Sequence, residues 1–264
     1  MIAKPKTPLI IGHRGAAAVA PENTLAAFAR ALHDGADGIE FDVRLSRDGQ
    51  PVVIHDATLK RTGNLRQAVS SMTAADLQKV DVGSWFNRRF RKHARAEYSR
   101  EGLPTLAEVF TAIRETGALL YVELKSDGVV SKDLAAGVST LISGYQLLDR
   151  VIVESFTLGN LELVKQIDSR IRTAALFEPR REPLSLLSGR RLIRRALKAG
   201  AEEIALHRSS VNQRVVSAAK ESGLAVVVWT VDSPSYIARA QRLGIKSVIT
   251  NRPAEMLRRR DGAD

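Results

Sequence analysis

The sequence predicts an α/β protein in which eight parallel strands close into a (β/α)8 TIM barrel. Short aliphatic or β-branched runs alternate with longer amphipathic segments, and most of the short runs are continuously apolar. Such runs are typical of parallel strands that helices cover, and eight repeats favour closure. The expected strands are Leu9–Gly12, Gly38–Val43, Leu119–Leu124, Val151–Glu154, Thr173–Phe177, Glu203–Leu206, Ala225–Val231 and Ser247–Thr250.

Segments of helical length lie between nearly all of these strands, and glycine follows several of them. Glycine adopts the left-handed conformation that ends a helix without a steric penalty. We expect the Asn23 side chain to cap the first helix. The expected helices are Thr24–Asp34, Thr105–Thr116, Leu134–Ser143, Leu158–Ile167, Arg190–Ala199, Asn212–Ser222 and Ser235–Leu243, and the closing glycines are Gly35, Gly117, Gly200, Gly223 and Gly244.

A doubly wound open sheet is the alternative architecture. It normally carries an early glycine-rich phosphate loop, and the sequence contains neither a GxGxxG nor a Walker A pattern. A length of 264 residues is normal for one barrel. We therefore expect residues 1–264 to form a single barrel domain, with a frayed tail at Arg258–Asp264.

One long segment interrupts the strand–helix repeat. Asp48-Gly49 is a strong tight-turn signal, so we expect Val52–Ile54 to return antiparallel to the second strand. Residues 57–103 then displace the helix that should follow, with weak helical character at Asp76–Val80. Loops of this length are commonly functional. We interpret 57–103 as an inserted, lid-like segment, in which basic residues are interleaved with Trp85, Phe86, Phe90 and Tyr98.

The composition narrows the function classes. Hydrophobic residues make up 44% and charged residues 26%, as in globular proteins. Because the chain has no cysteine, a disulfide framework, a thiolate metal site and a cysteine nucleophile are excluded. The net charge, 40 − 29 = +11, favours anionic partners. The first residues lack the apolar stretch of a signal peptide, and no window reaches the roughly 20 apolar residues of a membrane span, so we expect a cytoplasmic protein.

Reactive side chains gather at the carboxyl ends of the predicted strands, where barrel enzymes place their active sites. Each signal is weak alone, and a lone histidine at a strand end is more often structural, as we expect for His207. Their shared placement is what indicates a catalytic site. The residues are His13, Arg14, Glu40, Asp42, His55, Glu123, Lys125, Glu154, Trp229 and Asn251.

Three acidic residues predict a metal site. Glu40 and Asp42 lie two apart on one strand, so their side chains point to the same side. Glu123 of the next barrel strand can join them, and a bound cation removes the repulsion among three close carboxylates. Oxygen ligands alone favour one divalent cation of the hard type, Mg²⁺ or Ca²⁺. Together with Arg14 and Lys125, that ion would hold a phosphate group.

The motifs that contain these residues resemble those of the glycerophosphodiester phosphodiesterase family. They run in order from residue 9 to about residue 257, and their combination is highly specific. They are His13-Arg14-Gly15, Pro21-Glu22-Asn23-Thr24, Glu40-Phe41-Asp42-Val43, Val53-Ile54-His55-Asp56, Arg61-Thr62, Leu103-Pro104-Thr105-Leu106, Glu123-Leu124-Lys125, Ser155-Phe156, Trp229-Thr230-Val231 and Ile249-Thr250-Asn251-Arg252-Pro253.

The resemblance implies a (β/α) barrel, metal ligation by Glu40, Asp42 and Glu123, and general acid–base roles for His13 and His55. It also implies phosphate contacts from Arg14 and Lys125. Trp229 either lines the substrate's glycerol or head group or belongs to the core. Two positions depart from the family pattern: Asp232 stands where asparagine is frequent, and Asn251 stands where aspartate is frequent. Neither is expected to touch the catalytic set.

The implied activity is the metal-dependent hydrolysis of small glycerophosphodiesters to glycerol 3-phosphate and an alcohol such as choline or ethanolamine. In the family's usual scheme, a neighbouring glycerol hydroxyl attacks first, and water then opens the cyclic phosphate. One histidine accepts a proton and the other donates one. The sequence leaves open which of His13 and His55 is the acid.

Three other functions are alternatives to this hydrolysis. A nucleic-acid binder would use the basic charge and the aromatic residues of 57–103 for stacking, but no RNA-binding motif is present and we expect no nucleic-acid partner. A glycoside hydrolase would use paired carboxylates without needing Arg14, Lys125 and two histidines. A phospholipase D-like enzyme would act on lysophospholipids at an anionic membrane surface. The oligomeric state is open.

Overall fold

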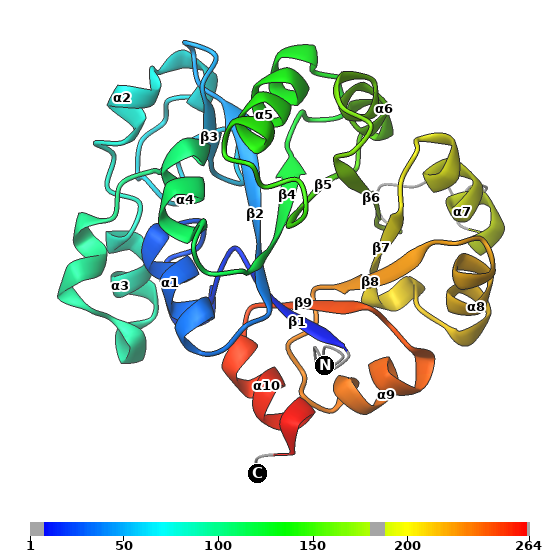
Figure 1. The fold of residues 1–264 in the computed structure, drawn as a ribbon. Coiled ribbons are helices and arrows are strands. Elements are labelled where there is room, and N and C mark those ends of the chain that lie inside the picture. Colours follow the sequence, from blue (N-terminus) through cyan, green and yellow to red (C-terminus); the bar gives the residue numbers. More distant parts are fainter. Residues whose placement is uncertain (1–7, 180–187, 263–264) are drawn as a thin grey trace.

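The computed structural model describes residues 8–179 and 188–262, and eight of its strands form a closed parallel barrel (Figure 1). Each strand pairs with its neighbours in chain order, and β1 pairs with both β2 and β9, which closes the ring. The predicted barrel is confirmed, and the open-sheet alternative is wrong. The barrel strands are β1 (Leu9–His13), β2 (Gly38–Leu45), β4 (Leu119–Leu124), β5 (Val151–Ser155), β6 (Arg172–Phe177), β7 (Glu203–His207), β8 (Ala225–Trp229) and β9 (Ser247–Thr250).

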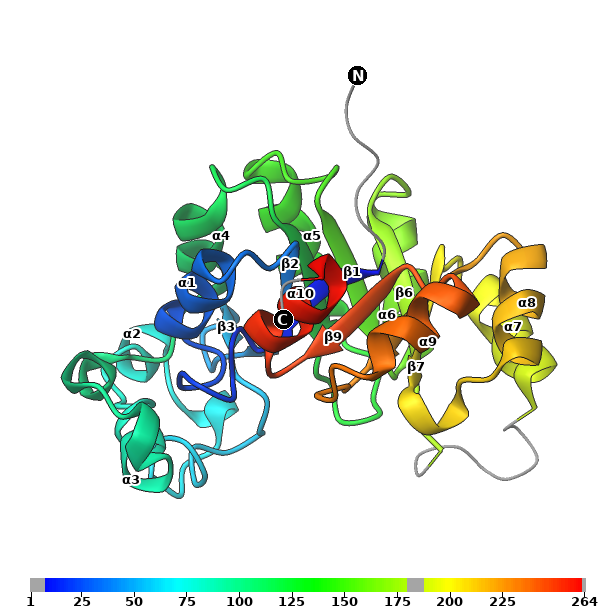
Figure 2. The same cartoon turned by 90° about the horizontal axis from the view of Figure 1, so that it is seen from below.

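Helices surround the barrel, as the views in Figures 1 and 2 agree, and each lies in the chain between two successive barrel strands or after the last one. The five glycines expected at helix ends all have positive φ angles, between 62° and 94°, so their predicted role is confirmed. The surrounding helices are α1 (Leu25–His33), α4 (Leu106–Ile113), α5 (Lys132–Gly144), α6 (Leu158–Ile167), α7 (Gly189–Lys198), α8 (Gln213–Glu221), α9 (Tyr236–Leu243) and α10 (Pro253–Asp261), and a short turn η5 (Arg208–Ser210) follows β7.

The alternation of side chains along each strand decides what faces the barrel interior. In β2, Phe41 and its apolar neighbours two residues away pack against the helices, in the large core between strands and helices. Glu40 and Asp42 therefore point inward. In β4 the same alternation directs Val122 outward, and Tyr121 and Glu123 inward. A small apolar cluster that includes Tyr121 fills the barrel interior.

The hairpin after β2 forms as predicted, with β3 (Pro51–Val53) antiparallel to β2. Residues 57–103 follow it and pack a small core of their own, which includes Leu59 and Leu77. The expected helix at Asp76–Val80 lies slightly earlier, because the Thr73 side chain caps its start. The segment contains η1 (Val69–Ser71), α2 (Ala74–Leu77), α3 (Ser84–Arg89), η2 (Arg91–His93) and η3 (Ala96–Arg100).

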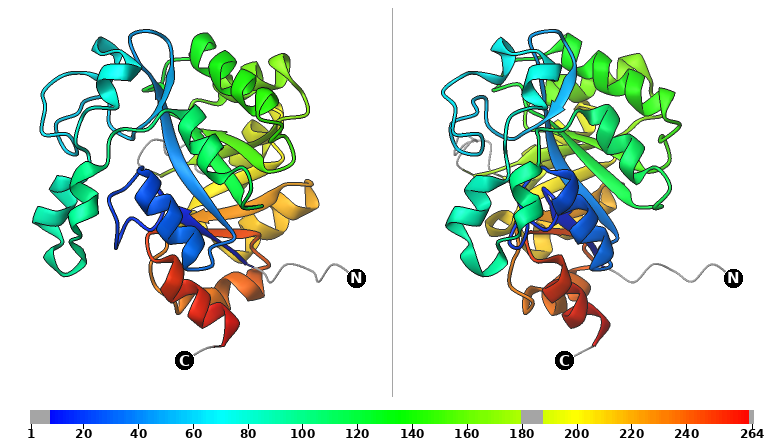
Figure 3. Two further views of the ribbon diagram at one scale, coloured as in Figure 1. Left: turned by 60° about the vertical axis from the view of Figure 1, so that its left-hand side comes forward. Right: turned by 90° about the vertical axis from the view of Figure 1, so that its left-hand side faces the viewer.

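The aromatic residues of 57–103 serve packing. Phe86 is completely buried and Tyr98 nearly so, and both contact the α1 side of the barrel through Ala20 and Ala27. Figure 3 shows α2 and α3 beside the barrel. Buried rings cannot stack on nucleobases, which speaks against the nucleic-acid alternative. Within the described residues, 57–103 contributes nothing to the lining of the main pocket, and its role as a lid stays a prediction.

Two local expectations are wrong. Thr24, not Asn23, caps α1, since its side-chain oxygen accepts from the backbone N–H of Ala27. The residues Arg258–Asp261 are not frayed but complete α10, where the Arg260 guanidinium pairs with Asp37. The rest of that expected tail, 263–264, and residues 1–7 at the other end lie outside the described residues. Of the helices described, none is long and apolar enough to cross a membrane.

Gly38, the first residue of β2, tests the close packing of the barrel. A Cβ atom added there would lie 2.3 Å from the carbonyl oxygen of Leu119, so β2 and β4 would have to separate. We predict that Gly38→Ala lowers the free energy of unfolding by about 1–3 kcal/mol, the usual effect of overpacking, as measured by urea denaturation.

Gly144→Ala is the matched control, because nothing lies within 4 Å of a Cβ at this helical position. That variant should be neutral or slightly more stable. Equal denaturation midpoints for the two variants would contradict the packing argument.

Candidate active site

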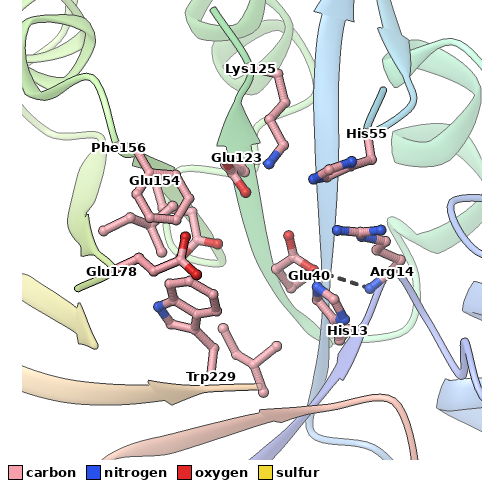
Figure 4. Close-up of a pocket in the computed structure, with 12 residues that line it drawn as sticks. His13, Arg14, Glu40, His55, Glu123, Lys125, Glu154, Phe156, Glu178 and Trp229 are labelled. Atoms are coloured by element: carbon pink, nitrogen blue, oxygen red, sulfur yellow. Dashed lines mark hydrogen bonds and ion pairs between the residues drawn. The ribbon is translucent and has the colours of Figure 1, made fainter. Parts of the chain in front are cut away.

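A cavity of about 150 Å³ opens at the carboxyl ends of the barrel strands. It is far larger than the roughly 10–15 Å³ that one water needs. Eight of the ten residues that indicated a catalytic site from the sequence line it, and Asp42, one of the other two, lies buried against them. The lining residues are His13, Arg14, Glu40, His55, Glu123, Lys125, Glu154, Phe156, Leu176, Glu178, Trp229 and Ile249 (Figure 4).

Three buried carboxylates form the floor of the site. Glu40, Asp42 and Glu123 each offer an oxygen, and these oxygens lie within 4.8 Å of one another. Burial, followed by the negative charges of Asp42 and Glu123, raises the pKa of Glu40 well above its usual range. Burial also raises the pKa of Glu123 to about 7. Three buried carboxylates lie close together, and two of them have raised pKa values, so they are not all ionised without a counter-charge. Such a group of oxygen donors fits a hard divalent cation.

Two basic side chains lie against this acidic cluster. The Lys125 Nζ atom is 2.8 Å from an oxygen of Glu123 and 3.1 Å from one of Asp42. The Arg14 Nε atom is 3.0 Å from the other oxygen of Asp42, an ion pair without hydrogen-bond geometry. Burial alone would raise the pKa of Asp42, but the charges of Arg14 and Lys125 hold it well below its usual value. The pocket therefore combines fixed positive charge with potential metal ligands.

The turn after β1 explains how Arg14 reaches the site. Arg14 and Gly15 both have positive φ angles, 52° and 82°. A Cβ on Gly15 would lie 2.5 Å from backbone atoms of Ala27, so only glycine lets the chain pass this close to α1. In this conformation the backbone N–H of Arg14 donates to Glu40 over 3.1 Å.

A chain of ion pairs joins Arg14 to His55. Glu22 accepts from Arg14 at 2.8 Å and from Arg61 at 2.7 Å. Arg61 also donates to Asp56 at 2.7 Å, and Asp56 lies 2.6 Å from the His55 Nδ1 atom. Burial would raise the pKa of Asp56, but the hydrogen bond from Arg61 brings it to about 2, so Asp56 is an anion beside His55. Sequence reasoning left Glu22, Asp56 and Arg61 out of the site, although all three lie in the quoted motifs.

His13 has a different partner. Its Nδ1 atom lies 2.8 Å from the Oδ1 atom of Asn251, and its Nε2 atom lies 3.8 Å from Glu40. Asn251 is held in turn by Asp232 at 2.8 Å. The expectation that Asn251 stays apart from the catalytic set is therefore wrong, whereas Asp232 is linked to His13 through Asn251. Burial, with the charge of Arg14, lowers the pKa of His13 to about 4.

Asn23 also belongs to the site. Its side-chain amide donates to Asp42 at 2.8 Å, and its carbonyl oxygen accepts from the Asp42 backbone N–H at 3.3 Å. The residue has a φ of 58°, a left-handed conformation that asparagine tolerates better than most residues. These contacts, not helix capping, explain asparagine at this position, because they fix the orientation of the Asp42 carboxylate.

The opposite wall of the pocket is aromatic and acidic (Figure 4). The rings of Phe156 and Trp229 lie 5.5 Å apart, nearly perpendicular, and His207 packs on Trp229 at 5.3 Å. Glu154 is 2% exposed, and its Oε2 atom has no hydrogen-bond partner among the described residues. Burial and the neighbouring Glu40 raise the pKa of Glu154 well above its usual range. Glu154 was identified from the sequence at the end of a predicted strand. Glu178 was missed, since it follows an apolar strand and belongs to none of the motifs.

Comparisons with known proteins agree with this architecture. A model of the glycerophosphoryl diester phosphodiesterase family matches residues 13–255. The glycerophosphodiester phosphodiesterase of Caldanaerobacter subterraneus is 33% identical over 250 residues, which cover 94% of this chain and 96% of that protein.

Solved structures give the same result. A phosphodiesterase from Oleispira antarctica, in complex with the product sn-glycerol-3-phosphate, has a TM-score of 0.84 at 27% identity, covering 96% of this chain and 97% of that one. A glycerophosphodiester phosphodiesterase from Agrobacterium tumefaciens has a TM-score of 0.76 at 27% identity, covering 94% and 97%. With its barrel, its acidic cluster and its paired histidines in one pocket, the chain belongs to the glycerophosphoryl diester phosphodiesterase family and is an enzyme of that family.

Proposed function

We propose that this enzyme hydrolyses small glycerophosphodiesters to glycerol 3-phosphate and an alcohol in a metal-dependent reaction. One observation carries the proposal: two imidazoles, two fixed cations and three buried carboxylates converge on a single pocket. The Oleispira antarctica relative, which binds sn-glycerol-3-phosphate as its product, supports the choice of substrate. A glycoside hydrolase would not need the cations and imidazoles that face this pocket.

In the proposed complex, Arg14 and Lys125 bind the phosphate oxygens that face them. Glu40, Asp42 and Glu123 would hold one divalent cation, Mg²⁺ or Ca²⁺. When bound, such an ion offsets the repulsion of the carboxylates and withdraws charge from the phosphate. Lys125 contacts two of the three carboxylates, so its ammonium group would be free to bind the substrate once a cation balanced their charge.

The two histidines would divide the proton transfers. His55 donates a proton to the leaving alcohol oxygen, since the Asp56 anion 2.6 Å from its Nδ1 atom favours the imidazolium form. His13 has a neutral amide as its partner and a lowered pKa. It therefore accepts the proton of the attacking hydroxyl at its Nε2 atom. Burial lowers the pKa of His55 as well, so its acid role depends on Asp56.

The opposite wall would bind the alcohol part of the substrate. Phe156 and Trp229 offer apolar ring surface, and the unpartnered Glu154 oxygen offers an acceptor for a hydroxyl or ammonium group. Cations on one wall and carboxyl groups on the other match a substrate with an anionic phosphate and a cationic head group. Trp229 lines the pocket and also packs against His207, which supports a role for its ring in binding the alcohol part.

A lysophospholipid at an anionic membrane surface is the second candidate substrate. Val129 and Val130, in the loop after β4, are 70% and 48% exposed. The neighbouring Asp127 and Gly128 line a groove together with His55 and Phe156, so these two apolar side chains stand near the mouth of the site, where lipid would approach. A role in lipid and glycerol metabolism and a cytoplasmic location complete the proposal, and the absence of cysteine fits a reducing compartment.

Replacing either imidazole tests the proton-transfer roles. We predict that His13→Ala and His55→Ala each lower turnover by roughly 10²–10⁴-fold, the usual size of general acid–base effects, while the circular dichroism spectrum is unchanged. Release of glycerol 3-phosphate from glycerophosphocholine is the measurement. Turnover like that of the native enzyme in both variants would exclude a two-histidine mechanism.

Ion binding should release protons. In the ion-free protein, the pKa of Glu123 is about 7 and that of Glu40 lies well above its usual value, so a cation must displace protons to bind. We predict that affinity for Mg²⁺ or Ca²⁺ rises by at least about tenfold between about pH 6 and about pH 8. Calorimetric titration in buffers of different ionisation enthalpy measures both the affinity and the protons released. Equal affinity at both pH values, with no proton release, would contradict this linkage.

Chelation and substrate choice test the activity itself. Exhaustive chelation should abolish hydrolysis of glycerophosphocholine, and added Mg²⁺ or Ca²⁺ should restore it. Full activity with metal content measured at zero would remove the ion from the reaction. In the same assay, faster cleavage of a lysophospholipid than of glycerophosphocholine would favour the second candidate.

A further inference from the structure

A hydrogen-bonded chain leads from the loop after β8 to the ring of His13. The carboxylate of Asp232 accepts from three donors: the Asn251 side-chain amide at 2.8 Å, the Asn251 backbone N–H at 2.8 Å and the Thr250 hydroxyl at 3.0 Å. The backbone N–H of Val231 donates to Ile249 at 3.0 Å, which ties this loop to β9. Asn251 is thus held rigidly at two points by one anion.

The charge of Asp232 fixes which way the Asn251 amide points. A carboxylate only accepts hydrogen bonds, so the NH₂ group of Asn251 must face Asp232. The two ends of an amide have nearly the same shape, and only their partners decide the orientation. The carbonyl oxygen of Asn251 is therefore left to face His13.

This orientation in turn fixes the tautomer of His13. The Asn251 Oδ1 atom only accepts, so the His13 Nδ1 atom, 2.8 Å away, must carry the hydrogen. In the neutral ring, the lone pair then lies on the Nε2 atom, on the side of Glu40, 3.8 Å away. The nitrogen beside the acidic cluster is the one that can accept a proton.

We propose that Asp232 is a positioning residue for the reaction and acts through Asn251 to hold His13 in the Nδ1–H tautomer. Asp232 is half-buried and is absent from the lining of the pocket in the described chain, so it does not touch substrate. The benefit for turnover rests on the proposed function, whereas the tautomer itself does not.

The decisive variant is Asp232→Asn. The new side chain can keep its carbonyl oxygen toward the Asn251 backbone N–H and the Thr250 hydroxyl, which places its NH₂ group against that of Asn251. Two donors cannot pair, so the Asn251 amide turns over and presents NH₂ to His13. The His13 Nδ1 atom must then accept, and its hydrogen moves to Nε2. Nitrogen-15 NMR of the imidazole distinguishes the two tautomers directly and needs no substrate.

We expect native protein to give the Nδ1–H signal and Asp232→Asn to give the Nε2–H signal. The turnover number should fall by about 10–100-fold, the usual effect of losing a partner that orients a functional histidine, with KM changed less than about twofold.

The double variant Asp232→Asn with Asn251→Asp is the rescue. Its carboxylate at position 251 accepts both from His13 Nδ1–H and from the new amide at position 232, so the Nδ1–H signal and most of the turnover should return. Ser233→Ala is the control in the same loop. The Ser233 hydroxyl pairs with exposed Ser235 and with no other side chain in the part of the chain that the structure describes, so this variant should change neither readout.

An Nδ1–H signal that persists in Asp232→Asn would overturn the proposal. The proposal would also be overturned by a double variant with the same melting temperature as the native protein that recovers neither the Nδ1–H tautomer nor the turnover. That result would assign Asp232 a purely structural role. If native protein shows the expected tautomer but does not cleave any glycerophosphodiester, the proposed function fails and the positioning role of Asp232 loses its catalytic meaning, although the tautomer stands.

Discussion

The site depends on the balance between buried negative charge and the cations placed around it. Three carboxylates point into the barrel because their strands alternate, and none could stay ionised there alone. Arg14 and Lys125 stabilise Asp42 in its ionised form, while Glu40 and Glu123 keep raised pKa values. The turn after β1 places Arg14 beside Asp42, and the Pro21-Glu22-Asn23-Thr24 motif places Asn23 on the same carboxylate. The insertion supplies Arg61 to Glu22 and Asp56.

The barrel could be predicted from the sequence because the spacing of apolar residues and the composition of each segment depend on neighbouring residues alone. Eight apolar runs and their closing glycines are visible without knowledge of distant contacts, and the alternation of Glu40 with Phe41 already implies which side faces inward. The acidic cluster followed from the same rule once strand order was assumed.

Sequence reasoning failed where loops from distant parts of the chain meet. The contact between His13 and Asn251 spans 238 positions, and no local pattern encodes it. Asn23 precedes a helix and so resembles a cap, yet Asp42 offers it a stronger, charged partner. Arg258–Arg260 resemble a frayed basic tail, but the pairing of Arg260 with Asp37 anchors α10. For Asn23 and for Arg260, a charged partner elsewhere in the sequence outweighed the local preference.

Arg61 gives the insertion an importance beyond its own small core. Its guanidinium bridges Glu22 and Asp56, so this one side chain influences the electrostatic surroundings of both Arg14 and His55. The remainder of the segment packs on itself, on Val52 and Ile54 of the hairpin and on the α1 side of the barrel. Loop exchange within 57–103 that preserves Arg61 and these apolar contacts should therefore leave the reactive groups of the barrel unaltered, so most of this segment is free to vary in sequence without cost to the chemistry.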